Sequence, residues 1–184
     1  MVYSNIVDAV RQVLRGCESR DPFEVCRRLG IILVPTSFGA EPTSIKGFFL
    51  EHRRVRTILY NCDLPPIIQR IIVAHELGHA VLHRNSSHNF TDIGLYDESS
   101  ICEKEANLFS AEFLLDDAEV INTLNNDCTF FAAAAMLMVP VELLDFKFRM
   151  MKKKGCHVTV SPIMAKNNFL RDIEIPACCD DYES

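Results

Sequence analysis

The chain has 184 residues, of which 48% are apolar and 24% are charged, and its formal net charge is −6. This composition is typical of a globular protein with a sizeable core, and no apolar run approaches the roughly 18 residues that a membrane-spanning helix needs. The acidic balance argues against a general affinity for the nucleic-acid backbone, which calls for clustered Lys and Arg. We therefore expect neither direct nucleic-acid binding nor membrane association.

The N-terminal residues and the cysteines indicate the cellular compartment. Residues 1–5 lack the charged and apolar regions of a signal peptide, and the 8 cysteines include no C-x-x-C pair. We therefore expect a cytoplasmic protein with reduced thiols. The less favoured interpretation is a second metal site or redox sensor, and its candidate residues are Cys156, His157, Cys178 and Cys179.

The first 60 residues predict two helices followed by a small antiparallel sheet. Apolar residues recur at helical spacing over 4–15, and Asp21-Pro22 with Gly30 delimit a second helix. Apolar runs at 31–34, ended by Pro35, at 46–50 and at 55–60 predict three strands, the last two joined as a hairpin. An edge of this sheet can hold an extended peptide by strand addition.

The next segment, from about Ile67 to His83, predicts a helix that carries the motif H-E-L-G-H. His75 and His79 lie one turn apart on the same face, so both imidazoles can reach a single metal ion. Glu76 is rotated by about 100° from His75, so its carboxylate can reach a metal-bound water and act as the general base. Zinc lowers the pKa of its bound water to about 7 and polarises a carbonyl, so this pattern predicts a catalytic zinc site.

Other residues of the same helix have expected structural roles. Ala74, Gly78 and Ala80 are small enough to let a neighbouring backbone approach closely. His83 lies one turn beyond His79 and can approach the metal shell, but we favour a helix-end histidine satisfied by solvent or by the helix dipole.

A catalytic zinc takes three protein ligands, so one ligand must come from elsewhere in the chain. Residues 84–99 are polar and predict a loop, and 99–115 predict a strongly amphipathic helix that carries Glu103, Glu105 and Glu112. Ser100 and Glu103 have the spacing of a capping box, which turns Glu103 back toward the helix start. Glu105 adjoins the apolar face of the helix. We therefore favour Glu105 as the third ligand, with Glu103 as the alternative.

The two motif segments, Val73–His83 and Glu103–Leu115, together resemble the ImmA/IrrE family of zinc metallopeptidases, and the similarity covers about residues 30–150. The resemblance implies a mostly helical, zincin-like (gluzincin-type) α+β fold with a small antiparallel sheet. It also implies that His75 and His79 are zinc ligands, that Glu76 is the general base, and that Glu105, directly before the Ala-Asn pair, is the third ligand.

The carboxyl-terminal third predicts short helices at 116–124, 128–138 and 140–151. The last two have the spacing of a helix-turn-helix unit, but Glu142, Leu143 and Asp145 offer acid and hydrocarbon where a DNA-reading helix exposes basic or amide groups. We favour core packing or repressor docking for this unit. The expected divisions are a metallopeptidase core at 1–115, a helical subdomain at 116–154 and a tail at 155–184.

The leading hypothesis is a zinc-dependent endopeptidase that hydrolyses a protein substrate, with Glu76 activating a zinc-bound water. The resemblance implies that the substrate is a helix-turn-helix transcriptional repressor and that the protein acts in gene regulation, often on mobile elements. The alternative is a non-hydrolytic regulator or antirepressor that docks a partner protein through the same fold.

Overall fold

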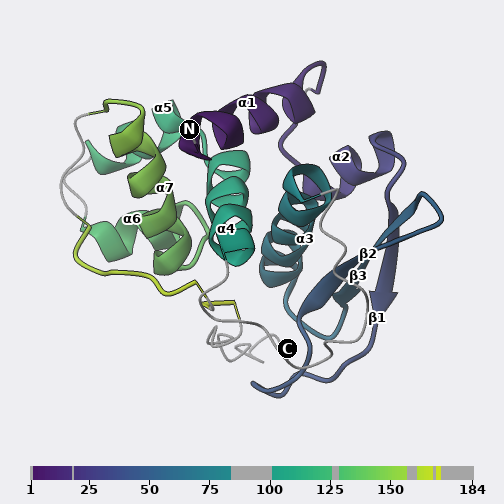
Figure 1. The fold of residues 1–184 in the computed structure, drawn as a ribbon. Helices are drawn as coiled ribbons and strands as arrows, with labels where there is room; N and C mark the ends of the chain where they lie inside the picture. The colour runs from purple at the N-terminus through teal and green to yellow at the C-terminus, as the bar shows by residue number, and fades with distance from the viewer. Residues whose placement is uncertain are drawn as a thin grey trace.

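A computed structural model describes residues 2–17, 19–83, 101–125, 129–156, 161–167 and 169–170. Within these ranges the chain forms seven helices and one three-stranded sheet (Figure 1). The helices are α1 (Val2–Leu14), α2 (Pro22–Arg28), α3 (Pro66–Leu82), α4 (Ile101–Leu114), α5 (Asp117–Leu124), α6 (Phe130–Met136) and α7 (Val141–Lys153). The strands are β1 (Ile32–Thr36), β2 (Gly47–His52) and β3 (Val55–Asn61). The predicted α+β class is confirmed.

The second helix begins and ends as its sequence predicts. The Asp21 carboxylate accepts a hydrogen bond from the Phe23 backbone N–H at 3.1 Å, which satisfies one of the free amides of the first turn. Gly30 has a φ of +68°, a conformation that glycine adopts without steric cost, and it follows the helix. The Arg28 guanidinium donates to the Arg15 carbonyl at 2.7 Å, so α2 is tied to the segment that follows α1.

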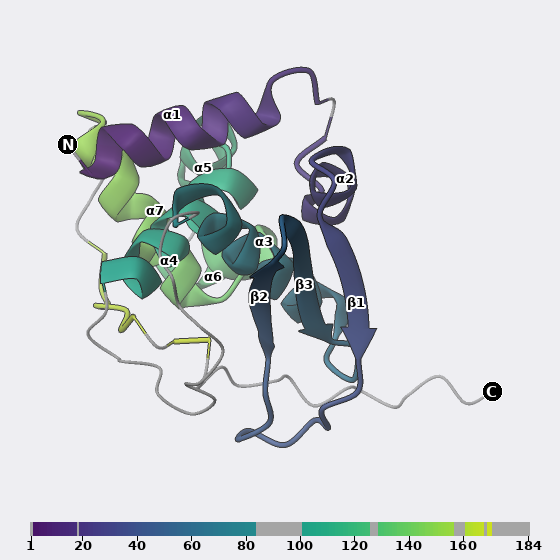
Figure 2. The same ribbon diagram turned by 45° about the vertical axis from the view of Figure 1, so that its right-hand side comes forward.

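The sheet is mixed, which corrects the predicted antiparallel arrangement. β3 lies between its neighbours, antiparallel to β2 and parallel to β1 (Figure 2). The chain reverses over residues 37–46 and places β2 on the far side of β3, so β1 and β3 run in the same direction. The predicted hairpin is confirmed, with Arg53 and Arg54 in positive-φ conformations at its turn. β1 continues through Pro35, because an edge strand tolerates a missing donor.

Helices α3 and α4 lie side by side at the centre of the molecule (Figure 1). A Cβ atom added to Gly78 would lie 3.1 Å from Cδ1 of Phe109 and 3.2 Å from Cα of Ala106, both on α4. The absence of a side chain therefore lets the two helices approach closely, as the small residues of α3 predicted. Gly47 has the same role in β2, where a Cβ would lie 2.6 Å from a methyl group of Ile72 on α3.

Helices α5 to α7 lie on the opposite side of α4 from the sheet (Figure 1). A cluster of charged side chains joins α5 and α7 to α4. The Lys147 side chain on α7 is 1% exposed and its Nζ lies 2.8 Å from Glu112 on α4 and 2.6 Å from Asp117 on α5. Lys154 contacts the same two carboxylates. Two cations thus balance two anions at a site where Lys147 is fully buried and Asp117 is partly exposed.

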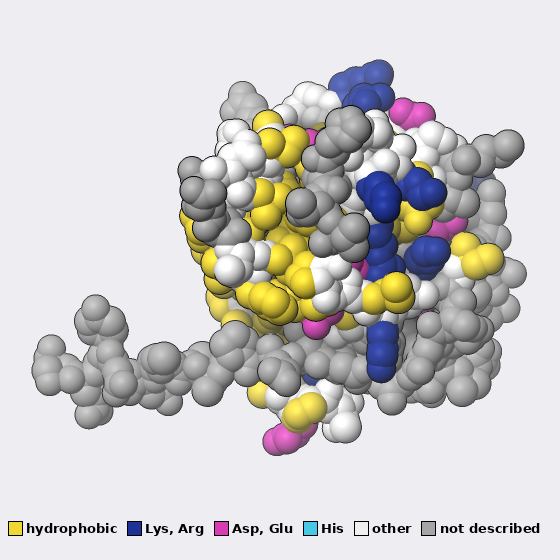
Figure 3. All heavy atoms as spheres, turned by 90° about the vertical axis from the view of Figure 1, so that its left-hand side faces the viewer, with side chains coloured by type: hydrophobic (Ala, Val, Ile, Leu, Met, Phe, Trp, Pro, Cys, Tyr) yellow, Lys and Arg dark blue, Asp and Glu magenta, His cyan; other side chains and the backbone are white. Residues whose placement is uncertain are grey.

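The outer face of this helical group exposes several large apolar side chains. Phe131, Met136 and Met138, on and just after α6, are more than half exposed. Figure 3 shows hydrophobic side chains gathered on this face of the molecule.

Several residues with expected roles lie outside the described residues: the loop at 84–99, the capping residue Ser100, and His157, Cys178 and Cys179 of the possible second metal site. Among the described cysteines, 17, 26, 62, 102 and 156 are free thiols. No helix in the described ranges is long and apolar enough to cross a membrane.

Candidate metal centre

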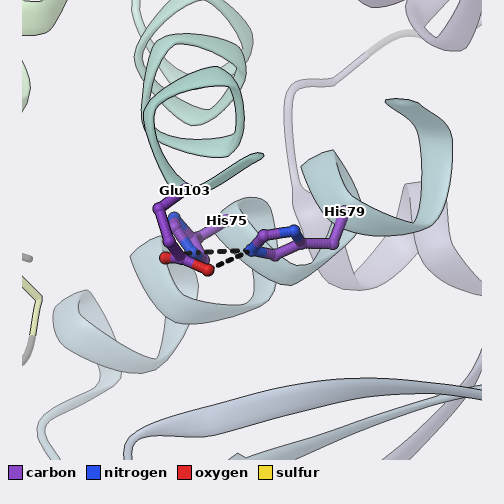
Figure 4. Close-up of side chains that lie close together, drawn as sticks. All are labelled: His75, His79 and Glu103. Carbon is purple, nitrogen blue, oxygen red and sulfur yellow. Dashed lines mark hydrogen bonds and ion pairs between the residues drawn. The ribbon is translucent and has the colours of Figure 1, made fainter. Parts of the chain in front are cut away.

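Three side chains from α3 and α4 bring potential metal ligands together (Figure 4). The Nε2 atoms of His75 and His79 lie 3.1 Å apart. One carboxylate oxygen of Glu103 lies 3.3 Å from Nε2 of His75, and the other lies 3.2 Å from Nε2 of His79. His75 is only 4% exposed, so its ring is held by packing. The predicted pairing of His75 and His79 on one face of α3 is present in the structure.

The sequence favours Glu105 as the third ligand, but in the structure Glu103 lies beside the two imidazoles. Oε2 of Glu105 lies 3.0 Å from Nε2 of His83, one turn further along α3. Residues two apart on a helix project about 200° apart, so only one of the two glutamates can face the histidine pair. The packing of the two helices favours Glu103, because it lies three residues before Ala106, whose backbone faces Gly78 on α3.

Hydrogen bonding alone cannot satisfy the three groups. Burial favours the neutral acid of Glu103, but hydrogen bonds with the two imidazoles hold its pKa well below the usual range, so the carboxylate is ionised. If each imidazole donated an N–H to this carboxylate, two N–H groups would face each other across 3.1 Å. A cation between the three groups removes this conflict.

The donor separations fit a zinc ion. Zinc–nitrogen bonds of about 2.0–2.1 Å in tetrahedral geometry place neighbouring ligand atoms roughly 3.3 Å apart. The three separations observed here are 3.1, 3.2 and 3.3 Å. Two imidazoles and one carboxylate are also a donor set of known catalytic zinc sites. His75, His79 and Glu103 would therefore hold the metal.

Glu76 is buried beside these ligands, between α3 and strand β2. Burial is the main cause that raises the pKa of Glu76 to about 7, and the charge of Glu103 adds to it. His79 and a hydrogen bond from the Phe49 backbone N–H act in the opposite direction. A carboxylate in this range can exchange a proton near neutral pH.

His83 lies behind His79 and is not the solvated helix-end residue that we expected. Its side chain is 10% exposed, its Nδ1 lies 3.1 Å from Nδ1 of His79, and its Nε2 contacts Glu105. Burial lowers the pKa of His83, while the hydrogen bond with Glu105 opposes this shift. By contrast, the buried Nδ1 of His75 has no hydrogen-bond partner among the described residues.

Comparison with known proteins identifies the family. The sequence matches the IrrE N-terminal-like domain, peptidase family M78, over residues 26–149. The chain belongs to the ImmA/IrrE family. As an ImmA/IrrE member it falls in a peptidase family that is generally zinc-dependent, which agrees with the donor set of the site. The matched range runs from α2 to α7 and so includes both helices that carry the candidate ligands.

The chain is also similar to a phage protein. It is 30% identical over 145 residues to "Uncharacterized immunity region protein 2" of Bacillus phage phi105, and the similarity covers 79% of this chain and 90% of the phage protein.

Proposed function

We propose that this ImmA/IrrE member is a zinc-dependent endopeptidase that hydrolyses a protein substrate. The observation that carries the proposal is the convergence of His75, His79 and Glu103 to within 3.3 Å of one another. The buried carboxylate of Glu76 lies next to this group. A protein that only docks a partner has no chemical need for a buried base beside three metal ligands.

Each residue has a distinct role in the proposed reaction. A zinc ion held by His75, His79 and Glu103 would polarise the peptide carbonyl and lower the pKa of a water molecule. Glu76 accepts the proton of the attacking water and then returns a proton to the departing amine. The backbone N–H of Phe49 fixes the carboxylate of Glu76 for this exchange, and the packing of α3 excludes bulk water from it.

The edge of β2 beside Glu76 is the proposed binding surface for an extended substrate. Among the described strands, β2 lies at one end of the order β1-β3-β2 and pairs with β3. The N–H of Phe49 in β2 hydrogen-bonds to Glu76, so this edge of the strand faces the metal ligands. A peptide that pairs with β2 would therefore lie alongside the base and the metal site.

The proposed substrate is a transcriptional repressor of the helix-turn-helix type, cleaved in the cytoplasm. The phage relative carries an immunity-region name, and repressors are the regulators that such a region would need to inactivate. The described part of the chain has no membrane-spanning helix that would place the site elsewhere.

The test incubates the purified protein with a helix-turn-helix repressor, with and without zinc. Cleavage should require zinc and should fall by about 10²- to 10⁴-fold in Glu76→Gln, which keeps the side-chain shape but removes the base. Glu119→Gln, on the exposed side of α5, is the matched control and should cleave normally. If both Glu76→Gln and the wild type derepress the target gene without cleavage, the protein acts by docking and the hydrolase proposal fails.

A further inference from the structure

A chain of hydrogen bonds extends from the candidate metal ligands into α4. Nδ1 of His79 lies 3.1 Å from Nδ1 of His83. Nε2 of His83 lies 3.0 Å from Oε2 of Glu105. The side chain of His83 is 10% exposed and that of Glu105 is 21% exposed, so water competes only weakly for these contacts. The three groups form a row that begins at the proposed metal site and ends at a carboxylate.

The charge of Glu105 fixes the direction of every hydrogen bond in this row. A carboxylate only accepts, so Nε2 of a neutral His83 must carry the proton that points at Glu105. Nδ1 of His83 then has a bare lone pair and can only accept. The proton between the two rings must therefore belong to Nδ1 of His79.

This direction leaves Nε2 of His79 without a proton. In the opposite arrangement, Nδ1 of His83 would donate to His79, and two bare acceptors would face each other at the 3.0 Å contact with Glu105. Nε2 of His79 would then carry a hydrogen in the direction of the metal ligands. Through the ring of His83, the carboxylate of Glu105 thus selects the tautomer of His79 that can bind a metal ion.

We propose that His83 and Glu105 are positioning residues that hold His79 in its metal-binding tautomer and orientation. This inference rests on the metal site of the proposed function and adds two residues that do not themselves bind the ion. A metal-binding histidine commonly donates its second N–H directly to a carboxylate or a carbonyl group. Here the imidazole of His83 lies between the ring of His79 and the carboxylate of Glu105.

The two histidine ligands are held in different ways. Nδ1 of His75 has no partner among the described residues, and the ring is 4% exposed, so packing holds that side of it. His79 is less buried and has the hydrogen-bonded row behind it. Loss of the row should therefore act on the metal site through His79.

The test measures zinc affinity with a chromophoric chelator as competitor, using zinc alone as the probe. His83→Ala and Glu105→Ala should each weaken zinc binding by about 10- to 100-fold, the usual effect of removing a partner of a metal ligand. Glu105→Gln should bind zinc more tightly than Glu105→Ala, because the amide oxygen can still accept from His83. Lys104→Ala, an exposed neighbour on α4, is the matched control and should keep wild-type affinity.

Imidazole ¹⁵N spectra provide a readout that a purely structural role would not change. In the zinc-free wild type, His79 should show one tautomer, protonated at Nδ1. In zinc-free Glu105→Ala it should show both tautomers, while circular dichroism confirms the fold of the variant. Wild-type zinc affinity and a single His79 tautomer in both Ala variants would overturn the positioning role alone. A wild-type protein that binds no zinc would overturn this role together with the metal site itself.

Discussion

Replacing Gly78 by Ala and by Val tests whether the close contact of α3 and α4 builds the metal site. The Cβ of Ala would lie 3.1 Å from Cδ1 of Phe109, and 3.2 and 3.3 Å from Cα and the carbonyl oxygen of Ala106. Favourable carbon contacts lie at about 3.5–4.0 Å. Both neighbours on α4 are fully buried, so the helix itself must move by a few tenths of an ångström.

Two effects of opposite sign determine the change in stability. Overpacking costs about 1–3 kcal/mol, and an Ala gains about 1 kcal/mol over a Gly within a helix. Gly78→Ala should therefore lower the free energy of unfolding by about 1 kcal/mol. Gly78→Val adds two further carbons and gains less from helix propensity, so its loss should approach 3 kcal/mol. A difference of 1 kcal/mol corresponds to about 2–4 °C in Tm for a chain of this size.

The assay combines chemical denaturation with zinc titration of the three proteins. Zinc affinity should fall in the order Gly, Ala, Val, because the displaced Ala106 lies one turn from Glu103 and binding sites tolerate shifts of only about 0.5 Å. The pair Gln12→Gly and Gln12→Ala, at an exposed position of α1, measures helix propensity alone. The Gln12 pair gives the gain in the free energy of unfolding that Ala has over Gly from helix propensity alone. If Gly78→Ala stabilises the protein by that same amount, the packing argument is refuted.

Three further predictions follow from the ion pairs. Glu103→Ala should abolish stoichiometric zinc binding in equilibrium dialysis, because only the imidazoles of His75 and His79 remain as ligands. If this variant still binds one zinc ion per chain, another group is the third ligand. Glu112→Gln removes one of the two carboxylates that contact the buried Lys147 cation, while Asp117 remains. The free energy of unfolding in urea should therefore fall by about 1–3 kcal/mol, and an unchanged midpoint would contradict the burial argument. Burial raises the pKa of Asp117, but ion pairs with Lys147 and Lys154 outweigh it and the net shift is downward. The difference in the free energy of unfolding between wild type and Asp117→Asn should therefore be fully present above pH 3.8, the ordinary pKa of an Asp, and shrink as the pH falls below it. A difference that grows in acid would show that the pKa of Asp117 is raised rather than lowered.

The sequence alone determined the elements with strong local signals. Apolar periodicity and the Asp21 and Gly30 boundaries predicted α2, and the hairpin residues predicted the pairing of β2 and β3. The spacing of His75 and His79 placed both rings on one face of α3 because a helix repeats every 3.6 residues. Each of these features depends on residues within a few positions of one another, and local geometry is sufficient to fix them.

Only the tertiary structure decided which glutamate completes the site. Glu103 and Glu105 belong to the same helix, and the choice depends on how α4 is rotated against α3, which the contact of Gly78 with Ala106 and Phe109 sets. The parallel pairing of β1 with β3 likewise depends on where residues 37–46 carry the chain. Such features arise from packing between segments distant in sequence, so no local pattern encodes them. The row from His79 through His83 to Glu105 is of the same kind, because its two halves meet only when the helices pack.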